Sequence, residues 1–204
     1  MTDATAFVGA PWYMPPVISA LKVAPTEEPL TLAQAKLRAG LDWPTGDPRD
    51  DLMKAFIAAA RAKVELDTGL ALLTQTRAIT FIAPVSWWSS DGGVVPLPMQ
   101  SLPLQSLTDP DGNPYTRFVS GYDQRLAAVR FWDEFQSGTW LAVSGWPDAA
   151  TLLAEAPLLV QAVGLLVAHY ATVGRDLAIV GTIVATTPQG YDDCIDPYRL
   201  VTLA

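Results

Sequence analysis

The chain has 204 residues, of which 50% are hydrophobic and 17% are charged, and its formal net charge at pH 7 is -8. This length and composition fit one folded core of ordinary size and exclude a chain that is disordered throughout. The excess of acidic residues argues against a surface that binds nucleic acid, because the affinity of such surfaces comes from lysine and arginine.

The first 29 residues are rich in proline, with Pro11, Pro15, Pro16, Pro25 and Pro29. Proline fixes φ, removes an amide donor and pushes the preceding residue toward extended conformations, so residues 1–29 are predicted to form an extended arm. The arm is too apolar for a solvated tail, and we expect its apolar residues, Trp12 and Tyr13 among them, to lie along a neighbouring surface such as that of another chain. Its start lacks the basic and apolar regions of a secretory signal.

Two helices are predicted next, over residues 31–40 and 48–68. Thr31 and Gln34 have the spacing of a capping box, and Gly40 ends the first helix. The second helix starts at Asp47-Pro48 and ends at Gly69, with apolar residues recurring at three- and four-residue spacing along it.

Residues 72–145 change to short runs of β-branched and aromatic residues, which predicts a β-hairpin or β-sheet region. The stretch "DPDGNP" has the composition of a hairpin tip. The stretch "SWWSSDGG" is a second loop, in which Trp87 and Trp88 cannot both point into one core. One interpretation places one ring inward and one outward; the other, which we favour, is that a partner covers this loop.

A third main helix is predicted over residues 156–172. It is apolar nearly all round and should be the central helix, but Gln161 and His169 interrupt the run, which falls short of the roughly 20 apolar residues of a bilayer span. The resulting fold class is α+β: a small helical bundle of three main helices, with the inserted β region, forming a core over residues 30–175.

Residues 176–204 are predicted to be a C-terminal arm. Its end, "YDDCIDPYRLVTLA", is too apolar for an idle tail and too short for a core of its own. Tyrosine and arginine are common anchors at interfaces, so we expect this arm to dock on another protein. The residues expected to make this contact are Tyr191, Ile195, Pro197, Tyr198, Arg199 and Leu200. The alternative is that the arm folds back on its own helices.

Catalysis has little support in the sequence. His169 is the lone histidine and Cys194 the lone cysteine, so a zinc site and a Cys/His pair are both improbable, and Cys194 fits a free structural thiol. Asp50/Asp51 and Asp192/Asp193 are adjacent pairs that do not share a helix face. Neither phosphate-binding glycine motif is present. We therefore expect no cofactor, no metal and no enzymatic activity, with an uncharacterised enzyme as the remote alternative.

The order of these signals resembles the head-tail connector, or adaptor, proteins of long-tailed phages and of phage-derived gene transfer agents. The similar stretches run from about Leu21 to Leu200: "LKVAPTEEPLTLAQAKLRAGLD", "DDLMKAFIAAARAKVELDTGLALLTQT", "VPLPMQSLPLQSLTDPDGN", "LLVQAVGLLVAHYATVGR", and then "PQG" and "DPYRL". The long proline-rich start and the "VSWWSSDGG" segment depart from that pattern.

The resemblance implies a homo-oligomeric ring, commonly twelvefold, at the head-tail junction of a particle assembled in the bacterial cytoplasm. It implies that the C-terminal arm docks on the portal protein, that tail, stopper or terminator proteins bind the other side, and that double-stranded DNA passes through without specific binding. An inter-subunit or tail interface is then expected at Trp12, Tyr13, Trp87 and Trp88. No membrane partner is expected. An acidic surface would suit such a channel. A tail-completion or tube-end ring protein is the closer alternative function.

Overall fold

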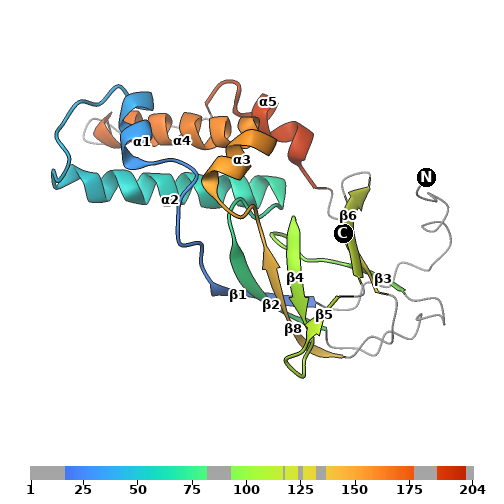
Figure 1. Ribbon diagram of the computed structural model, residues 1–204. Coiled ribbons are helices and arrows are strands. Elements are labelled where there is room, and N and C mark those ends of the chain that lie inside the picture. The colour runs from blue at the N-terminus through green and yellow to red at the C-terminus, as the bar shows by residue number, and fades with distance from the viewer. Residues whose placement is uncertain are drawn as a thin grey trace.

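The computed structural model describes residues 17–81, 93–116, 118–123, 126–131, 137–176 and 188–200. These residues form an α+β fold with a layer of helices above an antiparallel sheet (Figure 1). The helices are α1 (Leu32–Arg38), α2 (Arg49–Thr68), α3 (Ala149–Glu155), α4 (Pro157–Asp176) and α5 (Tyr191–Ile195), followed by the 3-10 helix η2 (Asp196–Tyr198). The predicted class, helices with an inserted sheet, is confirmed.

The strands form two antiparallel sheets. They are β1 (Val17–Val23), β2 (Gln75–Phe81), β3 (Gly93–Pro96), β4 (Leu104–Thr108), β5 (Pro114–Tyr115), β6 (Phe118–Asp123), β7 (Leu126–Phe131) and β8 (Gly138–Ser144). The main sheet has the order β1-β2-β8-β4-β5, and the smaller sheet has the order β3-β7-β6. In the main sheet Ile79 of β2 is paired with Trp140 of β8, and both side chains are buried in the core.

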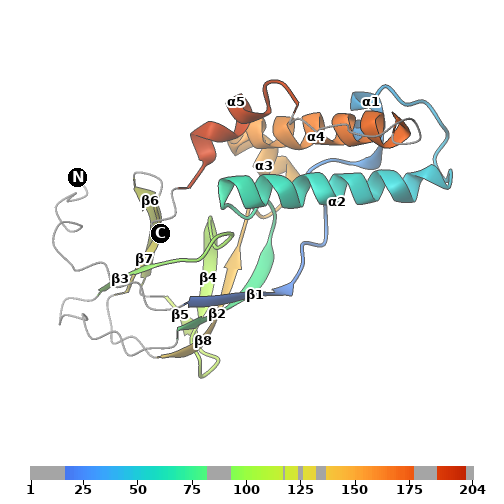
Figure 2. The same ribbon diagram turned by 180° about the vertical axis from the view of Figure 1, so that it is seen from behind.

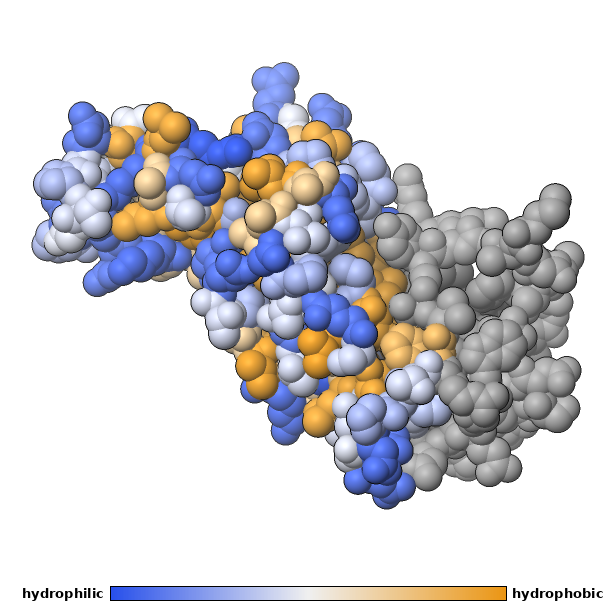
Figure 3. All heavy atoms as spheres, viewed as in Figure 1, coloured by the Kyte–Doolittle hydropathy of each residue, from blue (hydrophilic) through white to orange (hydrophobic). Residues whose placement is uncertain are grey.

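The helical layer is built on α2 and α4, which pack along each other, with α1 lying against both (Figures 1 and 2). Arg38 of α1 lies across α4 at Gly164, where an added Cβ would come within 2.2 Å of Arg38 Nη1. Arg38 Nη1 donates a hydrogen bond to Gln161 Oε1 at 2.7 Å. Glycine at position 164 therefore leaves room for the Arg38 side chain to lie across α4. The layer projects past the sheet on the side of α1 and the start of α2 (Figures 1 and 3).

The helix ends follow their sequence signals. Thr31 Oγ1 accepts from the amide of Gln34, and Gln34 Oε1 accepts from the amide of Thr31 at 2.9 Å, so the capping box is confirmed. Asp47 Oδ1 accepts from the amide of Arg49 at 2.9 Å, but the N-cap position of α2 is Pro48, which provides no side-chain cap, so the helix begins one residue later than expected. Gly69 ends α2 in the left-handed conformation, with φ of 78°.

Two expectations need correction. Part of the expected N-terminal arm is an edge strand, because Val17–Val23 pair with β2 in the main sheet. The strand was not predicted because the prolines on either side of it dominate the local sequence pattern. The short helix α3, capped by Asp148, was not expected, because "PDAATLLAEAP" lies between two prolines and is only two turns long. The hairpin tip is confirmed, since Asp109 Oδ1 accepts from the amides of Asp111 and Asn113 between β4 and β5.

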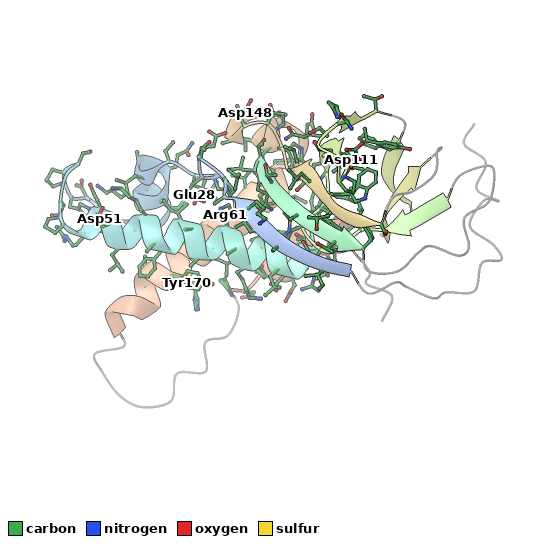
Figure 4. The ribbon with its side chains drawn as sticks, turned by 90° about the horizontal axis from the view of Figure 1, so that it is seen from below. Glu28, Asp51, Arg61, Asp111, Asp148 and Tyr170 are labelled. Carbon is green, nitrogen blue, oxygen red and sulfur yellow. The ribbon has the colours of Figure 1, made fainter. Side chains whose placement is uncertain are left out.

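A partly buried ionic cluster joins the segment between β1 and α1 to α2. Arg61 Nε lies 2.8 Å from Glu28 Oε2, and Arg61 Nη1 lies 3.0 Å from Glu65 Oε2. Figure 4 shows Glu28 and Arg61 pointing toward one another. Glu65 Oε1 also accepts from the amide of Leu72 at 3.0 Å, and burial raises the pKa of this carboxyl above its ordinary value. The cluster fixes the entry to α1 and the exit from α2 against each other.

Candidate interface site

The C-terminal segment was the main expected docking site, and its first part belongs to the core of this chain. Tyr191 is 1% exposed and Ile195 is fully buried, with α5 packed on α4 and α2. The Tyr191 hydroxyl donates to Asp67 Oδ2 of α2 at 2.8 Å. Burial, and next the hydrogen bond to Asp67, raise the pKa of Tyr191 well above its ordinary value. These two side chains stabilise the fold, as the alternative interpretation of this arm expected.

The second part of the segment lies at the surface while still attached to its own helices. Pro197 is exposed, and Tyr198, Arg199 and Leu200 are partly exposed. Arg199 is held by Asp192 Oδ1 at 2.6 Å and by Asp196 Oδ1 at 2.7 Å. The amide of Leu200 donates to the carbonyl of Thr68 at 2.8 Å. These contacts hold residues 197–200 at the surface, beside the C-terminal end of α2.

The aromatic residues expected at subunit or tail interfaces lie outside the described residues. These are Trp12, Tyr13, Trp87 and Trp88. Their interface role stays a prediction.

A second buried cluster, which sequence reasoning missed, holds the loop between α1 and α2. Asp50 Oδ1 lies 2.6 Å from Lys36 Nζ and accepts from Trp43 Nε1 at 2.7 Å, and Asp50 Oδ2 accepts from the amide of Gly46 at 2.8 Å. The hydrogen bond from Lys36, and next that from Trp43, lower the pKa of Asp50 from 3.8 to about 2. From the sequence, Asp50 was explained by its place in the first turn of α2, where the helix dipole favours an acid. Lys36 on the preceding helix was the signal that could have indicated its ion pair.

Cys194 and His169, the residues considered for catalysis or metal binding, lie in or beside the core. Cys194 is a buried free thiol, and burial, and next the Asp193 carboxylate, raise its pKa. His169 is half-buried beside Tyr170, with the ring centroids 6.2 Å apart. Among the residues that the structure describes, no three His, Cys, Asp or Glu side chains are grouped so that they could hold a metal ion.

Within the described ranges, no single helix combines the length and apolar composition of a bilayer span. The pair Ala149–Glu155 and Pro157–Thr172 meets the length and composition criteria only when taken together, and it is bent by 112°.

The fold is that of chains found in gene transfer agent particles, and the likeness covers nearly the whole chain. One similar chain is from the virion of a native gene transfer agent (GTA) particle, with a TM-score of 0.59 and 20% identity over 92% of this chain and 97% of that one. A second is from the neck of an empty GTA particle computed with C6 symmetry, with a TM-score of 0.61 and 21% identity over the same shares.

A third chain is from the neck of a native GTA particle computed with C12 symmetry, with a TM-score of 0.54 and 19% identity over 91% of this chain and 97% of that one. No protein-family model and no curated protein sequence matches the chain. The likeness therefore concerns the fold, and it spans both the helical layer and the inserted sheet.

Proposed function

We propose that this protein is a structural component of the neck of a gene transfer agent or phage-like particle, where it joins the capsid to the tail. The observation that carries the proposal is the likeness in fold to chains of GTA necks, over 91–92% of this chain and 97% of theirs. A match of that extent includes both main helices of the layer and strands of the inserted sheet. The clusters around Asp50 and Arg61 fit the same role, since they hold loops and linkers in place.

In this proposal the protein assembles as a homo-oligomeric ring, twelvefold in its expected form, at the head-tail junction. The symmetries of the similar neck structures, C6 and C12, support a ring. The ring forms part of the channel for double-stranded DNA, and the net charge of -8 keeps DNA from adhering to it. Tail, stopper or terminator proteins bind on the side away from the capsid.

The portal docks on the surface end of the C-terminal segment, through Pro197, Tyr198, Arg199 and Leu200. Two features support this assignment. The first is that these residues are accessible. The second is that the ion pairs of Arg199 with two aspartates, and the hydrogen bond from Leu200 to Thr68, fix their conformation before binding, so less entropy is lost when a partner binds. Tyr191 and Ile195 contribute by holding this support in place.

The experiment mixes purified protein with assembled portal and measures the products by native mass spectrometry. We expect a ring-on-portal complex from the wild-type protein. Arg199→Ala should weaken portal binding about tenfold or more, as interface arginines commonly do. Arg49→Ala is the matched control, because Arg49 is also an exposed arginine paired with an aspartate, Asp47, at 2.7 Å. It should leave portal binding unchanged.

The same experiment distinguishes the connector role from the alternative function, a tail-completion ring. Stable binding to tail-tube protein, with none to portal, would contradict the connector role and support a tail-completion ring. Equal losses in Arg199→Ala and Arg49→Ala would contradict the assignment of residues 197–200 as the docking site.

A further inference from the structure

Arg77 of β2 is a half-buried arginine without a carboxylate partner. Its Nε donates a hydrogen bond to Ser19 Oγ of β1 at 2.9 Å, and its Nη1 donates one to Gln100 Oε1 at 2.8 Å. Both acceptors are neutral, and within the described part of the chain Arg77 forms no ion pair. A guanidinium has more N–H donors than these two bonds use, so Nη2 is left for a further acceptor.

The electrostatic setting of Arg77 is the opposite of that of Arg61. Arg61 lies 2.8 Å from a carboxylate oxygen of Glu28 and 3.0 Å from one of Glu65. Burial lowers the pKa of Arg77, and the Glu65 carboxylate opposes this shift as a smaller effect. Glu65 is already bonded to Arg61 and to the amide of Leu72. A half-buried cation without an opposite charge is poorly stabilised, so the isolated chain gains little from the charge of Arg77.

Gln100, which orients Arg77, is held in an unusual backbone conformation. Its φ is 64°, and among the described residues no other residue except glycine has a positive φ. The Gln100 amide donates to the carbonyl of Gly69 at 2.6 Å, and the Gln100 carbonyl accepts from Ser144 Oγ at 2.9 Å. Strained conformations of this kind persist where the surrounding structure fixes them, and they cluster at functional sites. Gln100 thus holds the guanidinium in one orientation.

Arg77 lies at the same end of α2 as the proposed docking residues. The carbonyls of Thr68 and Gly69, where α2 ends, accept from the amides of Leu200 and Gln100 at 2.8 and 2.6 Å. Figure 1 shows β2 below the helical layer, near the end of α2. The docking residues and the support of Arg77 are therefore bonded to consecutive residues of one turn.

Apolar side chains lie beside Arg77 and beside the docking residues. Leu21 of β1 is paired with Arg77, so both side chains are on the same face of the sheet, and Leu21 is 48% exposed. An added Cβ at Gly69 would lie 3.3 Å from Leu200 and 3.4 Å from Met99, which are both half-buried. An arginine bordered by side chains that exclude water is common near the centre of protein interfaces.

The charges at this end of α2 indicate which kind of group Arg77 can bind. Arg199, the other arginine there, already pairs with Asp192 at 2.6 Å and with Asp196 at 2.7 Å. Arg77 has no such partner within the described residues. An acidic side chain of another protein would balance its charge, and a carboxylate matches the planar guanidinium because its two oxygens can accept from two N–H groups.

We propose that Arg77, positioned by Ser19 and Gln100, binds an aspartate or glutamate carboxylate of the portal when the portal docks on residues 197–200. This inference rests on the proposed portal contact and deepens it, because it names the chemical group that the portal supplies. Arg77 is the electrostatic anchor of the contact, and residues 197–200 provide the adjoining surface.

Arg77→Met tests this assignment, because the substitution keeps an apolar stem and removes the charge. In titrations with assembled portal, we expect the variant to bind about tenfold or more weakly than the wild type. The melting temperature of the isolated variant should equal or exceed that of the wild type, since a charge without a carboxylate partner is removed. Arg49→Met is the control, because it removes a positive charge at the opposite end of α2. It should leave portal affinity unchanged.

A double-mutant cycle identifies the portal group. Asp→Asn and Glu→Gln variants of the portal are each titrated with the wild-type protein and with Arg77→Met. One portal variant should weaken binding of the wild type about tenfold and have no further effect on Arg77→Met. Independent, additive effects for every portal variant would overturn the carboxylate assignment.

The remaining outcomes separate this inference from the proposed function. Wild-type portal affinity in Arg77→Met would overturn the inference alone, whether or not ring formation is weakened. Weaker portal binding together with a melting temperature several degrees lower would assign Arg77 to the fold and overturn it as well. If the wild-type protein itself binds no portal, the connector role fails and this inference fails with it.

Discussion

The hydroxyl of Tyr191 in α5 donates a hydrogen bond to Asp67 in α2, although the two residues are 124 positions apart in the sequence. Asp67 also pairs with Lys63 one turn earlier in α2. The contact fastens the C-terminal segment to the central helices, and the surface residues 197–200 follow directly from it. A segment with the composition of a docking arm is thus anchored at one end and accessible at the other.

Tyr191→Phe keeps the buried ring and removes only the hydroxyl. We expect it to lower the free energy of unfolding by about 1.5 to 3 kcal/mol, the range for a hydrogen bond to a charged group. Urea denaturation followed by circular dichroism measures this loss. Portal affinity should stay within about twofold of wild type. An unchanged unfolding free energy would mean that the bond to Asp67 contributes nothing to holding α5.

Deleting residues 191–204 should unfold or strongly destabilise the protein, because the deletion removes buried Tyr191 and Ile195 as well as the surface residues. The segment predicted from sequence to be a docking arm is thus in part a core element of this chain. Thermal denaturation of the truncated protein checks it. A melting temperature equal to that of the wild type would contradict the core role of α5.

Gly145→Ala should be among the most damaging single changes in the described part of the chain. An added Cβ would lie 2.1 Å from the carbonyl oxygen of Leu73, and the residue has φ of 103°. We expect a loss of roughly 3 kcal/mol or more, or insoluble protein. Gly112→Ala is the matched control, since φ is 88° there but nothing lies within 4 Å of the added atom. It should cost only about 1 to 2 kcal/mol of backbone strain. Similar melting temperatures for the two variants would refute the close approach at Gly145.

Stability should depend on pH through Asp50. Its pKa in the folded state, about 2, lies below its ordinary value of 3.8, so its ionised form stabilises the fold. That contribution is fully present above about pH 4 to 5 and is lost as pH falls through about 2. The difference in urea denaturation between wild type and Asp50→Asn should therefore be constant at neutral pH and shrink between about pH 4 and 2.

Asp51→Asn provides the comparison for that experiment, because Asp51 is an exposed neighbour that pairs with Lys54. Its effect on the isolated protein should stay within about 0.5 kcal/mol at neutral pH. A difference for Asp50→Asn that is the same at pH 7 and pH 2 would contradict the account of the Lys36–Asp50–Trp43 cluster.

Replacing Trp87 and Trp88 together by Ser should leave the melting temperature of the isolated protein nearly unchanged and should block ring assembly or tail joining. The reason is that the pair is expected to serve an interface. A melting temperature lowered by several degrees would instead place at least one ring in the core, where such truncations cost about 3 to 5 kcal/mol.

The sequence predicted those parts of the fold that depend on local chemistry. The reciprocal bonds of Thr31 and Gln34, the left-handed Gly69 and the Asp109 turn are each determined by neighbouring residues, and each is confirmed. The strand β1 was missed because its pairing partner, β2, begins more than 50 residues later and the prolines around it dominate the local pattern.

Long-range packing explains the rest. Nothing near Tyr191 in the sequence indicates that its hydroxyl donates a hydrogen bond to Asp67. Likewise, nothing near Lys36 indicates that it pairs with Asp50 of the next helix. The docking residues were therefore predicted as one group, whereas the fold divides them into the buried pair Tyr191 and Ile195 and the surface residues 197–200.

The most direct test of the neck proposal is a symmetry-resolved reconstruction of intact particles that contain this chain, with its position identified by a small C-terminal label. The account predicts a closed ring, twelvefold in its expected form, immediately beneath the portal, with residues 197–200 toward the portal. Density for the chain at the far end of the tail tube, or in no ring at all, would contradict it.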